Sequence, residues 1–415
     1  MFSIDKWEEI FYTIRQNKLR TFLTAFGVFW GILMLVLLLG AGQGLQNGIM
    51  ADFSPDAVNS IWFMRGKTSL PYKGMPPGRS IRLTEEDLTS VKNNIDGIEY
   101  MSPENWLRGS FNIKHAGKSG PFTVYGVGKE YFNIKINQNY LDGRRLNFFD
   151  NIEARKVCII GERVRDILFE EGAPVVDQYI NIKDVNFKVV GVFKNDVWGG
   201  QFNERIYIPY ATFQNSFNPS KNVFLFAITV APGHRGKKVE QDVMDLLKAR
   251  HTVAPDDREA FWTHNQEEDY NQVMGLFTGI KGLVWFVGMG TLLAGIIGIS
   301  NIMIIIVKDR TKEIGIRKAI GATPWSIVSM ILLESVFITA IAGYIGLCLG
   351  VFMIEGINML IDSSGGDAGF FRRPEINLNV AITALIILVM SGALAGLVPA
   401  IKASKVKPIE ALRSE

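Results

Sequence analysis

The sequence predicts an α-helical membrane protein with four transmembrane helices and an extracytoplasmic α+β domain between the first and second of them. Four apolar runs carry almost no charge, although only 48% of the 415 residues are hydrophobic. Lysine and arginine gather beside these runs, mainly on one side of the predicted membrane. A long polar segment between the first two runs alternates short β-prone and helix-prone stretches. Together these three observations define the fold class.

Each of the four apolar runs is long enough to cross a bilayer. A spanning helix needs about 20 mainly apolar residues, because each residue adds about 1.5 Å and the hydrocarbon core is about 30 Å thick. We predict transmembrane helices 1 to 4 at residues 21–42, 282–307, 327–353 and 376–401. The first run is not expected to be a cleaved signal peptide, because its apolar core exceeds the usual 7–15 or so residues.

The basic residues give these helices an orientation. Lysine and arginine precede helix 1, fill the segment between helices 2 and 3, and follow helix 4, whereas the loop between helices 3 and 4 has only Arg372 and Arg373. Basic flanks tend to stay in the cytoplasm. Both termini, the loop 308–326 and the tail 402–415 are therefore predicted to be cytoplasmic, and the loop 354–375 to lie outside.

Residues 1–20 form a predicted juxtamembrane helix. Ile4, Trp7, Phe11 and Ile14 recur at three- and four-residue spacing among charged residues, which is the pattern of an amphipathic helix. Such a helix can lie on the inner membrane face or pack on the protein's own loops, and the sequence leaves both alternatives open.

The segment 43–281 is predicted to be one extracytoplasmic domain with two kinds of structure. A helix is expected at 84–94, where Thr84 precedes three acidic residues, and another at 237–250. Strands are expected at 58–64, 122–127, 156–160, 179–182, 187–193, 206–209 and 223–230. This order predicts an α/β part interrupted by a β-rich insertion at about 111–215.

Recognisable catalytic chemistry is absent from the sequence. Residues 117–119 read Gly-Lys-Ser, but a phosphate loop needs a glycine where Asn112 stands, so a hairpin turn is expected there. The four histidines are scattered without metal-ligand spacing, and the two cysteines do not form a disulfide framework. A net charge of +3 gives no global attraction for nucleic acid. We expect no catalytic residue, metal site or bound cofactor, and hence no enzyme.

Small residues and one carboxylate stand out within the predicted membrane helices. Glycine pairs at four-residue spacing allow helix backbones to approach closely. We expect a packing role for Gly27 and Gly31, for Gly346 and Gly350, and for Gly392 and Gly396. The intramembrane charge Glu334 lies about two turns into helix 3. A coupling role and a structural pairing with an interfacial lysine or arginine both remain open for it.

The cytoplasmic loop between helices 2 and 3 is the most specific segment of the chain. Residues 308–323 read KDRTKEIGIRKAIGAT, which places isoleucines among charged, helix-prone residues. This pattern suits docking into a groove of a cytoplasmic partner, although charge alone would also fit a solvated loop.

Several motifs resemble those of the MacB/FtsX family of ABC transporter permeases. GISNIMIIIVKDRTKEIGIRKAIGATPWSI resembles the family's second transmembrane helix with the following cytoplasmic loop, and RQNKLRTFLTAFGVFWGI resembles its entry into the first helix. LDGRRL, VCIIGERV, FKVVGVF and IYIPYATF are similar to the MacB-like periplasmic core domain. VPAIKASKVKPIEALRSE is similar to the family's C-terminal end.

The resemblance implies a permease subunit of a bacterial inner-membrane ABC transporter. ATP and Mg would be used by a separate cytoplasmic ABC ATPase, which is expected because the sequence begins at its juxtamembrane helix. Other implied partners are membrane lipid, a second permease copy or homologue, and, for efflux, a periplasmic adaptor and outer-membrane channel. The residues implied to contact the ATPase are Glu313, Ile314, Gly315, Ile316, Arg317 and Lys318.

The resemblance also implies how such a permease works. Its substrate-extruding members do not pass cargo through the membrane core. Instead, ATP binding closes the transmembrane dimer, and that motion drives cargo away from the periplasmic face. Efflux of peptides, toxins or antibiotics is the favoured function. The alternatives are a lipoprotein-releasing permease and an FtsX-like signal transmitter to cell-wall hydrolases, the latter disfavoured because its outer domain is usually much smaller.

Overall fold

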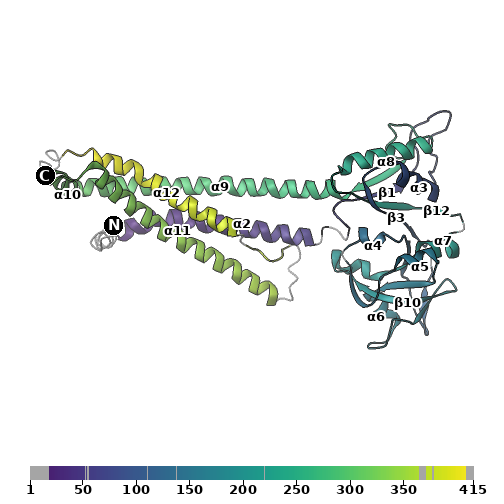
Figure 1. Ribbon diagram of the computed structural model, residues 1–415. Helices are drawn as coiled ribbons and strands as arrows, with labels where there is room; N and C mark the ends of the chain where they lie inside the picture. The colour runs from purple at the N-terminus through teal and green to yellow at the C-terminus, as the bar shows by residue number, and fades with distance from the viewer. Residues whose placement is uncertain are drawn as a thin grey trace. The chain divides into compact units, whose positions relative to one another are not determined.

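The computed structural model describes residues 18–407 except 52, 54–55, 110, 137, 219, 364–370 and 376–377. The chain divides into two compact units (Figure 1). Met50–Met274 form the first, here called the sheet unit, and Met1–Ile49 with Gly275–Glu415 form the second, here called the helical unit. The predicted juxtamembrane helix at 1–20 lies almost wholly outside the described residues.

The helical unit is built from long apolar helices. Its elements are α2 (Lys18–Ala51), α9 (Gln266–Asp309, whose first residues belong to the sheet unit), α10 (Thr311–Ala319), α11 (Pro324–Ser363) and α12 (Leu378–Ser404). Among the described residues, three stretches are long and apolar enough to cross a membrane: Ala25–Met50, Gln266–Asp309 and Pro324–Ser363. Val389–Ser404 of α12 is a shorter apolar helix. A fourth transmembrane helix at 376–401 therefore stays a prediction.

Helix α11 extends past the predicted end of transmembrane helix 3. We expected a loop to begin at residue 354, but the helix continues to Ser363. Ile354 is buried in the core of the helical unit, and the Asn358 side chain donates a hydrogen bond to the Pro374 carbonyl at 3.0 Å. These contacts stabilise the extra turns of α11. No proline and no two adjacent glycines occur between residues 354 and 363 to interrupt the helix.

The sheet unit is organised around one mixed sheet of twelve strands. In chain order these are β1 (Ser60–Arg65), β3 (Ile98–Trp106), β4 (Ile113–His115), β5 (Lys118–Gly120), β6 (Thr123–Val127), β7 (Asn139–Gly143), β8 (Val157–Gly161), β9 (Tyr179–Ile182), β10 (Val185–Lys194), β11 (Arg205–Pro209), β13 (Leu225–Val230) and β14 (Phe261–Asn265). The spatial order is β14-β1-β13-β3-β6-β11-β8-β10-β9-β4-β5, and β7 pairs with β10. The β8–β10 and β6–β11 pairs are parallel. Two short strands, β2 (Leu83–Thr84) and β12 (Asn222–Val223), pair separately.

Helices pack against the sheet and enclose more than one hydrophobic core with it. They are α3 (Glu85–Asn94), α4 (Tyr131–Ile134), α5 (Phe148–Ile152), α6 (Glu162–Leu168), the 3-10 helix η1 (Val197–Glu204), α7 (Tyr210–Phe217) and α8 (Gly236–Arg250). One core joins α3 and α8 to β1 and β13, for example through Val91, Val243 and Phe226. Another lies among β6, β8, β10 and α6, for example around Ile160 and Phe187.

Most of the predicted elements of the sheet unit are confirmed. The seven expected strands appear as β1, β6, β8, β9, β10, β11 and β13, and the two expected helices as α3 and α8. The Gly-Lys-Ser segment lies in the β4–β5 hairpin, where Ala116 and Gly117 have φ angles of 44° and 87°. These left-handed angles fit a tight hairpin turn and not a phosphate loop.

The segment predicted as a β-rich insertion contains more helix than expected. Helices α4, α5, α6, η1 and most of α7 fall between residues 111 and 215. Each has only four to eight residues, too few for a 3.6-residue periodicity to be visible in the sequence. Antiparallel pairing of β3 with β6, where Glu104 lies opposite Val127, joins this segment to the flanking strands in one sheet.

Candidate functional site

The predicted ATPase-coupling segment folds as the short helix α10. Its sequence favours a helix, because Glu313 and Arg317 stand four residues apart and their side chains form an ion pair at 3.0 Å. The helix ends where Ile320 leaves it and Gly321 adopts a φ of 104°, a left-handed angle that glycine adopts without strain. Residues 311–319 therefore form a short regular helix and not a solvated loop.

Two basic side chains of α10 connect it to its neighbours. The Lys318 ammonium donates to the carbonyls of Ser404 and Val406, at 2.6 and 2.8 Å, at the end of α12. A positive charge at a helix C-terminus satisfies carbonyls that lack helical partners. Arg317 contacts the Met330 sulfur of α11 at 2.7 Å. Helix α10 is therefore in direct side-chain contact with both α11 and the end of α12.

The six predicted contact residues divide between two faces. Ile314 and Gly315 are buried inside the helical unit, so their side-chain positions face its core and not a partner. Glu313 is exposed and Ile316 is 43% exposed, while Arg317 and Lys318 are partly buried by the contacts described above. Trp325, which the sequence reasoning did not select, is 73% exposed just beyond this segment. The sequence feature that could have pointed to Trp325 is a large aromatic residue two positions after the charged segment 308–323.

Glu334 is buried within the helical unit and lies next to α10. Its side chain is only 4% exposed, and one carboxylate oxygen is 3.6 Å from the Arg310 guanidinium. Arg310 is the residue immediately before α10. This geometry supports the structural pairing that the sequence left open, since a buried carboxylate requires a compensating charge.

The glycines of α2 and α11 lie where helices approach closely. A Cβ atom added to Gly27 of α2 would lie 3.3 Å from the Gly295 Cα of α9. A Cβ added to Gly346 of α11 would lie 2.6 Å from the Phe29 carbonyl oxygen of α2. Gly31 likewise faces α9, and Gly350 likewise faces α2. Side chains larger than hydrogen at these positions would push the backbones apart.

The glycines of α12 occupy a third contact, against α11. A Cβ added to Gly396 would lie 2.8 Å from the Ser335 Cβ, and one added to Gly392 would overlap the Thr339 side chain. The Ser335 hydroxyl donates to the Gly392 carbonyl at 2.9 Å. Close approach and a buried hydrogen bond thus act together to hold α11 and α12 side by side.

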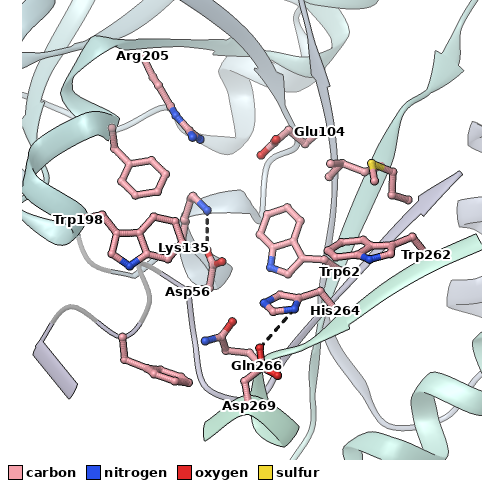
Figure 2. A pocket seen from close by; sticks show the side chains of 14 residues that line it. Asp56, Trp62, Glu104, Lys135, Trp198, Arg205, Trp262, His264, Gln266 and Asp269 are labelled. Atoms are coloured by element: carbon pink, nitrogen blue, oxygen red, sulfur yellow. Dashed lines mark hydrogen bonds and ion pairs between the residues drawn. The ribbon is translucent and has the colours of Figure 1, made fainter. Parts of the chain in front are cut away.

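The sheet unit contains a pocket of about 390 Å³ with largely aromatic walls (Figure 2). Trp62 and Trp262 come from β1 and β14, Trp198 and Phe202 from η1, and Phe53 from the segment after α2. Trp198 and Trp262 are both about half exposed at its rim. Trp198 has a φ of 52°, an unusual conformation for a bulky side chain.

Two charged side chains that line this pocket, Lys135 and Glu104, each have a close polar partner. The Lys135 ammonium lies 2.7 Å from Asp56 and 4.8 Å from the centre of a Trp62 ring. Glu104 accepts a hydrogen bond from the Tyr131 hydroxyl at 2.5 Å. Burial raises the pKa of Glu104, although the nearby Lys135 ammonium acts in the opposite direction.

Aromatic walls and one unpartnered buried donor give the pocket features of a binding site. The buried indole N–H of Trp62 has no hydrogen-bond partner among the described residues, so it could donate to a bound molecule. No described nucleophile is paired with a base there. Across the part of the chain that the structure describes, no group of histidine, cysteine and carboxylate residues could hold a metal ion. An amphipathic molecule with a flat apolar part fits these walls.

Two family profiles match the chain. The profile described as MacB-like periplasmic core domain matches residues 21–246, and that described as FtsX-like permease C-terminal matches residues 285–408. The macrolide export ATP-binding/permease protein MacB of Bdellovibrio bacteriovorus is 30% identical over 415 residues, which are 99% of this chain and 62% of that protein. An uncharacterized ABC transporter permease of Methanocaldococcus jannaschii is 29% identical, with 98% of this chain and 96% of that protein covered.

The chain spans only about three fifths of the length of the MacB relatives that it matches. Among solved structures, the periplasmic region of MacB from Actinobacillus actinomycetemcomitans is 18% identical with a TM-score of 0.43, and the match covers 53% of this chain and 94% of that one. The extracellular domain of the noncanonic ABC-type transporter YknZ from Gram-positive bacteria is 19% identical with a TM-score of 0.41. This match covers 50% of this chain and 100% of that one.

Proposed function

This chain belongs to the MacB/FtsX family of ABC transporter permeases, and from that premise we propose that it transmits motion from a cytoplasmic ATPase to its sheet unit. The family implies an ATPase partner. The uncharacterized ABC transporter permease of Methanocaldococcus jannaschii matches this chain over 96% of its own length, which supports placing ATP and Mg in a separate nucleotide-binding subunit. The proposed setting is a bacterial inner membrane, with four transmembrane helices, both termini in the cytoplasm and the sheet unit in the periplasm.

The observation that carries this proposal is the way α10 is held. Helix α10 exposes Glu313 and Ile316, while Lys318 connects it to the end of α12 and Arg317 connects it to α11. A partner that grips the exposed face would therefore move the two helices as well. An element that merely filled a cytoplasmic loop would not need these connections.

Two helices offer a continuous path from the helical unit into the sheet unit. Helix α9 runs without a break from Gln266, in the sheet unit, to Asp309, two residues before α10 begins. Helix α2 likewise continues to Ala51. We propose that these helices carry the motion outward, because a helix with all its backbone hydrogen bonds formed transmits displacement better than a flexible linker.

The proposed cargo of this motion is a small amphipathic molecule, peptide or toxin expelled from the periplasmic side. The name of the Bdellovibrio relative refers to macrolide export, and the aromatic pocket of the sheet unit supports an amphipathic cargo here. Efflux would require a second permease copy or homologue, with a periplasmic adaptor and an outer-membrane channel. Lipoprotein release is the alternative that shares the same helical layout.

Stimulation of the partner ATPase tests the proposal. The complex of this chain with its ATPase would be reconstituted in nanodiscs, and ATP hydrolysis measured with and without the permease. We expect Glu313→Arg and Ile316→Asp each to reduce stimulation by about tenfold, because a reversed charge or a buried carboxylate at a docked surface costs about 1.4 kcal/mol or more.

The matched control for Glu313→Arg is Glu355→Arg, which makes the same change at an exposed glutamate of α11. The control should stimulate the ATPase like the unaltered chain. Unchanged stimulation by both α10 variants, in protein that is inserted and folded, would refute the assignment of α10 as the coupling element.

A further inference from the structure

A second cavity in the sheet unit has three cationic side chains in its lining. It measures about 310 Å³, and its lining includes Arg65 at the end of β1, Arg108 just after β3, and Lys183 in the turn between β9 and β10. None of the described residues that line it is a carboxylate. Three segments far apart in the sequence thus bring three cations to one small polar space, which we call the arginine pocket.

Aromatic rings hold the two guanidinium groups of the arginine pocket in place. The Arg65 and Arg108 Cζ atoms lie 5.3 and 4.7 Å from the centre of the Phe224 ring. Arg108 is also 5.7 Å from the Trp106 ring, and the two rings pack together at 3.8 Å between centroids. Cation–π contacts orient arginine heads but do not neutralise them, so the positive charge remains available.

The cations of the arginine pocket lack carboxylate partners. No ion pair joins Arg65, Arg108 or Lys183 to an acidic group among the residues that the structure describes. Lys183 donates instead to the Arg108 carbonyl at 3.3 Å. Burial, together with the nearby charges of Arg108 and Arg82, lowers the pKa of Arg65. Like charges gathered without a counter-charge are unfavourable, and a bound anion would relieve this repulsion.

A hydrogen-bonded network of amides fixes the floor of the arginine pocket. The Asn105 oxygen accepts the Phe224 backbone N–H at 2.6 Å. The Asn218 amide donates to the Asn222 carbonyl at 2.8 Å, and the Asn222 amide donates to the Ser220 hydroxyl at 3.0 Å. Asn105 is buried, so the loop that carries Phe224 is anchored from within. The site is therefore a built cavity and not a chance gathering of surface side chains.

We propose that the arginine pocket binds the phosphate group of a small molecule or lipid headgroup through Arg65, Arg108 and Lys183. Guanidinium groups match phosphate oxygens in a two-pronged geometry, and a lysine adds a third charge. A phosphate monoester carries close to two negative charges at neutral pH, which suits three cations better than a single carboxylate does. The Trp106 and Phe224 rings would contact the organic part of the ligand.

Phosphate titration of the full-length chain, purified in an uncharged detergent, tests this proposal. Binding of inorganic phosphate and of glycerol 3-phosphate would be measured by calorimetry at constant ionic strength with chloride as background. We expect saturable binding by the unaltered chain, weakened by about tenfold or more in R65Q/R108Q, because charge-assisted hydrogen bonds are lost. The control R258Q, at an exposed arginine of the same unit outside the cavity, should bind normally.

The same measurement in nanodiscs separates the two sources of phosphate. Weaker apparent phosphate binding in nanodiscs that contain phosphatidic acid, whose headgroup is a phosphate monoester, than in phosphatidylcholine nanodiscs, with the difference lost in R108Q, would identify a lipid headgroup. Equal binding in both lipids would identify a soluble phosphate compound. Absence of phosphate binding, or equal affinity in the unaltered chain and R108Q, would overturn the proposal. R108Q serves here because Arg108 is exposed and its replacement leaves the buried network intact.

Discussion

Asp87 shows how a single side chain joins distant parts of the sheet unit. One carboxylate oxygen accepts the Thr84 backbone N–H at 2.9 Å, at the start of α3, and lies 3.0 Å from the His251 ring, just after α8. The other accepts the Arg250 guanidinium at 2.8 Å. These contacts lower the pKa of Asp87, against the opposing effect of burial, which is the largest. Asp87, one of the three acidic residues that follow Thr84, thus supports the start of α3 and also connects α3 to α8.

Replacement of Asp87 by asparagine should destabilise the sheet unit. We expect Asp87→Asn to lower the free energy of unfolding by about 2 kcal/mol at pH 7, because the buried network loses its negative charge and one of its two acceptor oxygens. The control Glu86→Gln removes a neighbouring exposed carboxylate and should have little effect. Thermal and denaturant unfolding of the detergent-solubilised chain, followed by circular dichroism, measures both.

The pH dependence of stability provides an independent check on Asp87. Its pKa in the folded chain lies below the ordinary aspartate value of about 3.9. Its stabilising contribution is therefore present above that value and is lost as pH falls through the acid range toward the folded pKa. The difference in stability between the unaltered chain and Asp87→Asn should shrink as pH falls below about 4. A difference that stays constant with pH would contradict the assigned network.

At the scale of elements, the helical unit depends on glycines placed between helices. Gly346 faces the backbone of α2 so closely that a methyl group has no room, whereas a Cβ added to Gly356 of the same helix would meet nothing within 4 Å. Both positions lie inside the helix α11, but only Gly346 packs closely against another helix. They therefore separate the effect of close helix contact from the intrinsic preference of alanine for helices.

Gly346→Ala and Gly356→Ala form a matched pair of predictions. We expect Gly346→Ala to destabilise the helical unit by about 1–3 kcal/mol, through overpacking against α2. Gly356→Ala should be neutral or stabilising by up to about 1 kcal/mol, since alanine favours the helix. Thermal inactivation of the purified protein in detergent compares them. Equal effects of the two changes would show that Gly346 does not mark a close contact.

Elements with a strong local pattern could be predicted from sequence, and those set by tertiary contacts could not. The strand β9 was predicted at its observed bounds, because its apolar residues are flanked by clear turn residues. The strand β3 was missed, since Pro103 and Glu104 interrupt it and a proline usually argues against an inner strand. The continuation of α11 to Ser363, past the predicted end of transmembrane helix 3, could not be predicted, because contacts such as that of Asn358 with Pro374 are invisible in the sequence.

The same limit applies to the candidate site. The sequence pointed to the segment that became α10, but it could not show that Ile314 and Gly315 face inward while Glu313 and Ile316 face outward. A nine-residue helix with isoleucines at only two positions, Ile314 and Ile316, has no single apolar face by pattern alone. The arginine pocket was beyond sequence reasoning altogether, because its cations come from three separate segments.

At the scale of the whole molecule, the chain consists of two units, and helix α9 runs from one into the other. The helical unit contains α10, the proposed coupling element, and the sheet unit contains the aromatic pocket and the arginine pocket. Helix α9 belongs to both units. The central claim is that an ATPase bound at α10 changes the position of the sheet unit relative to the helical unit.

A distance measurement between the two units tests this claim most directly. Spin labels at Ser119→Cys of β5 and Ser329→Cys of α11, in a Cys348→Ala background, would report the distance by electron paramagnetic resonance in nanodiscs with the partner ATPase. Cys158 is buried and should not react. We predict that trapping ATP shifts the distance distribution, and that Glu313→Arg abolishes the shift. An identical distribution with and without trapped ATP, in a complex whose ATPase is stimulated, would contradict the account.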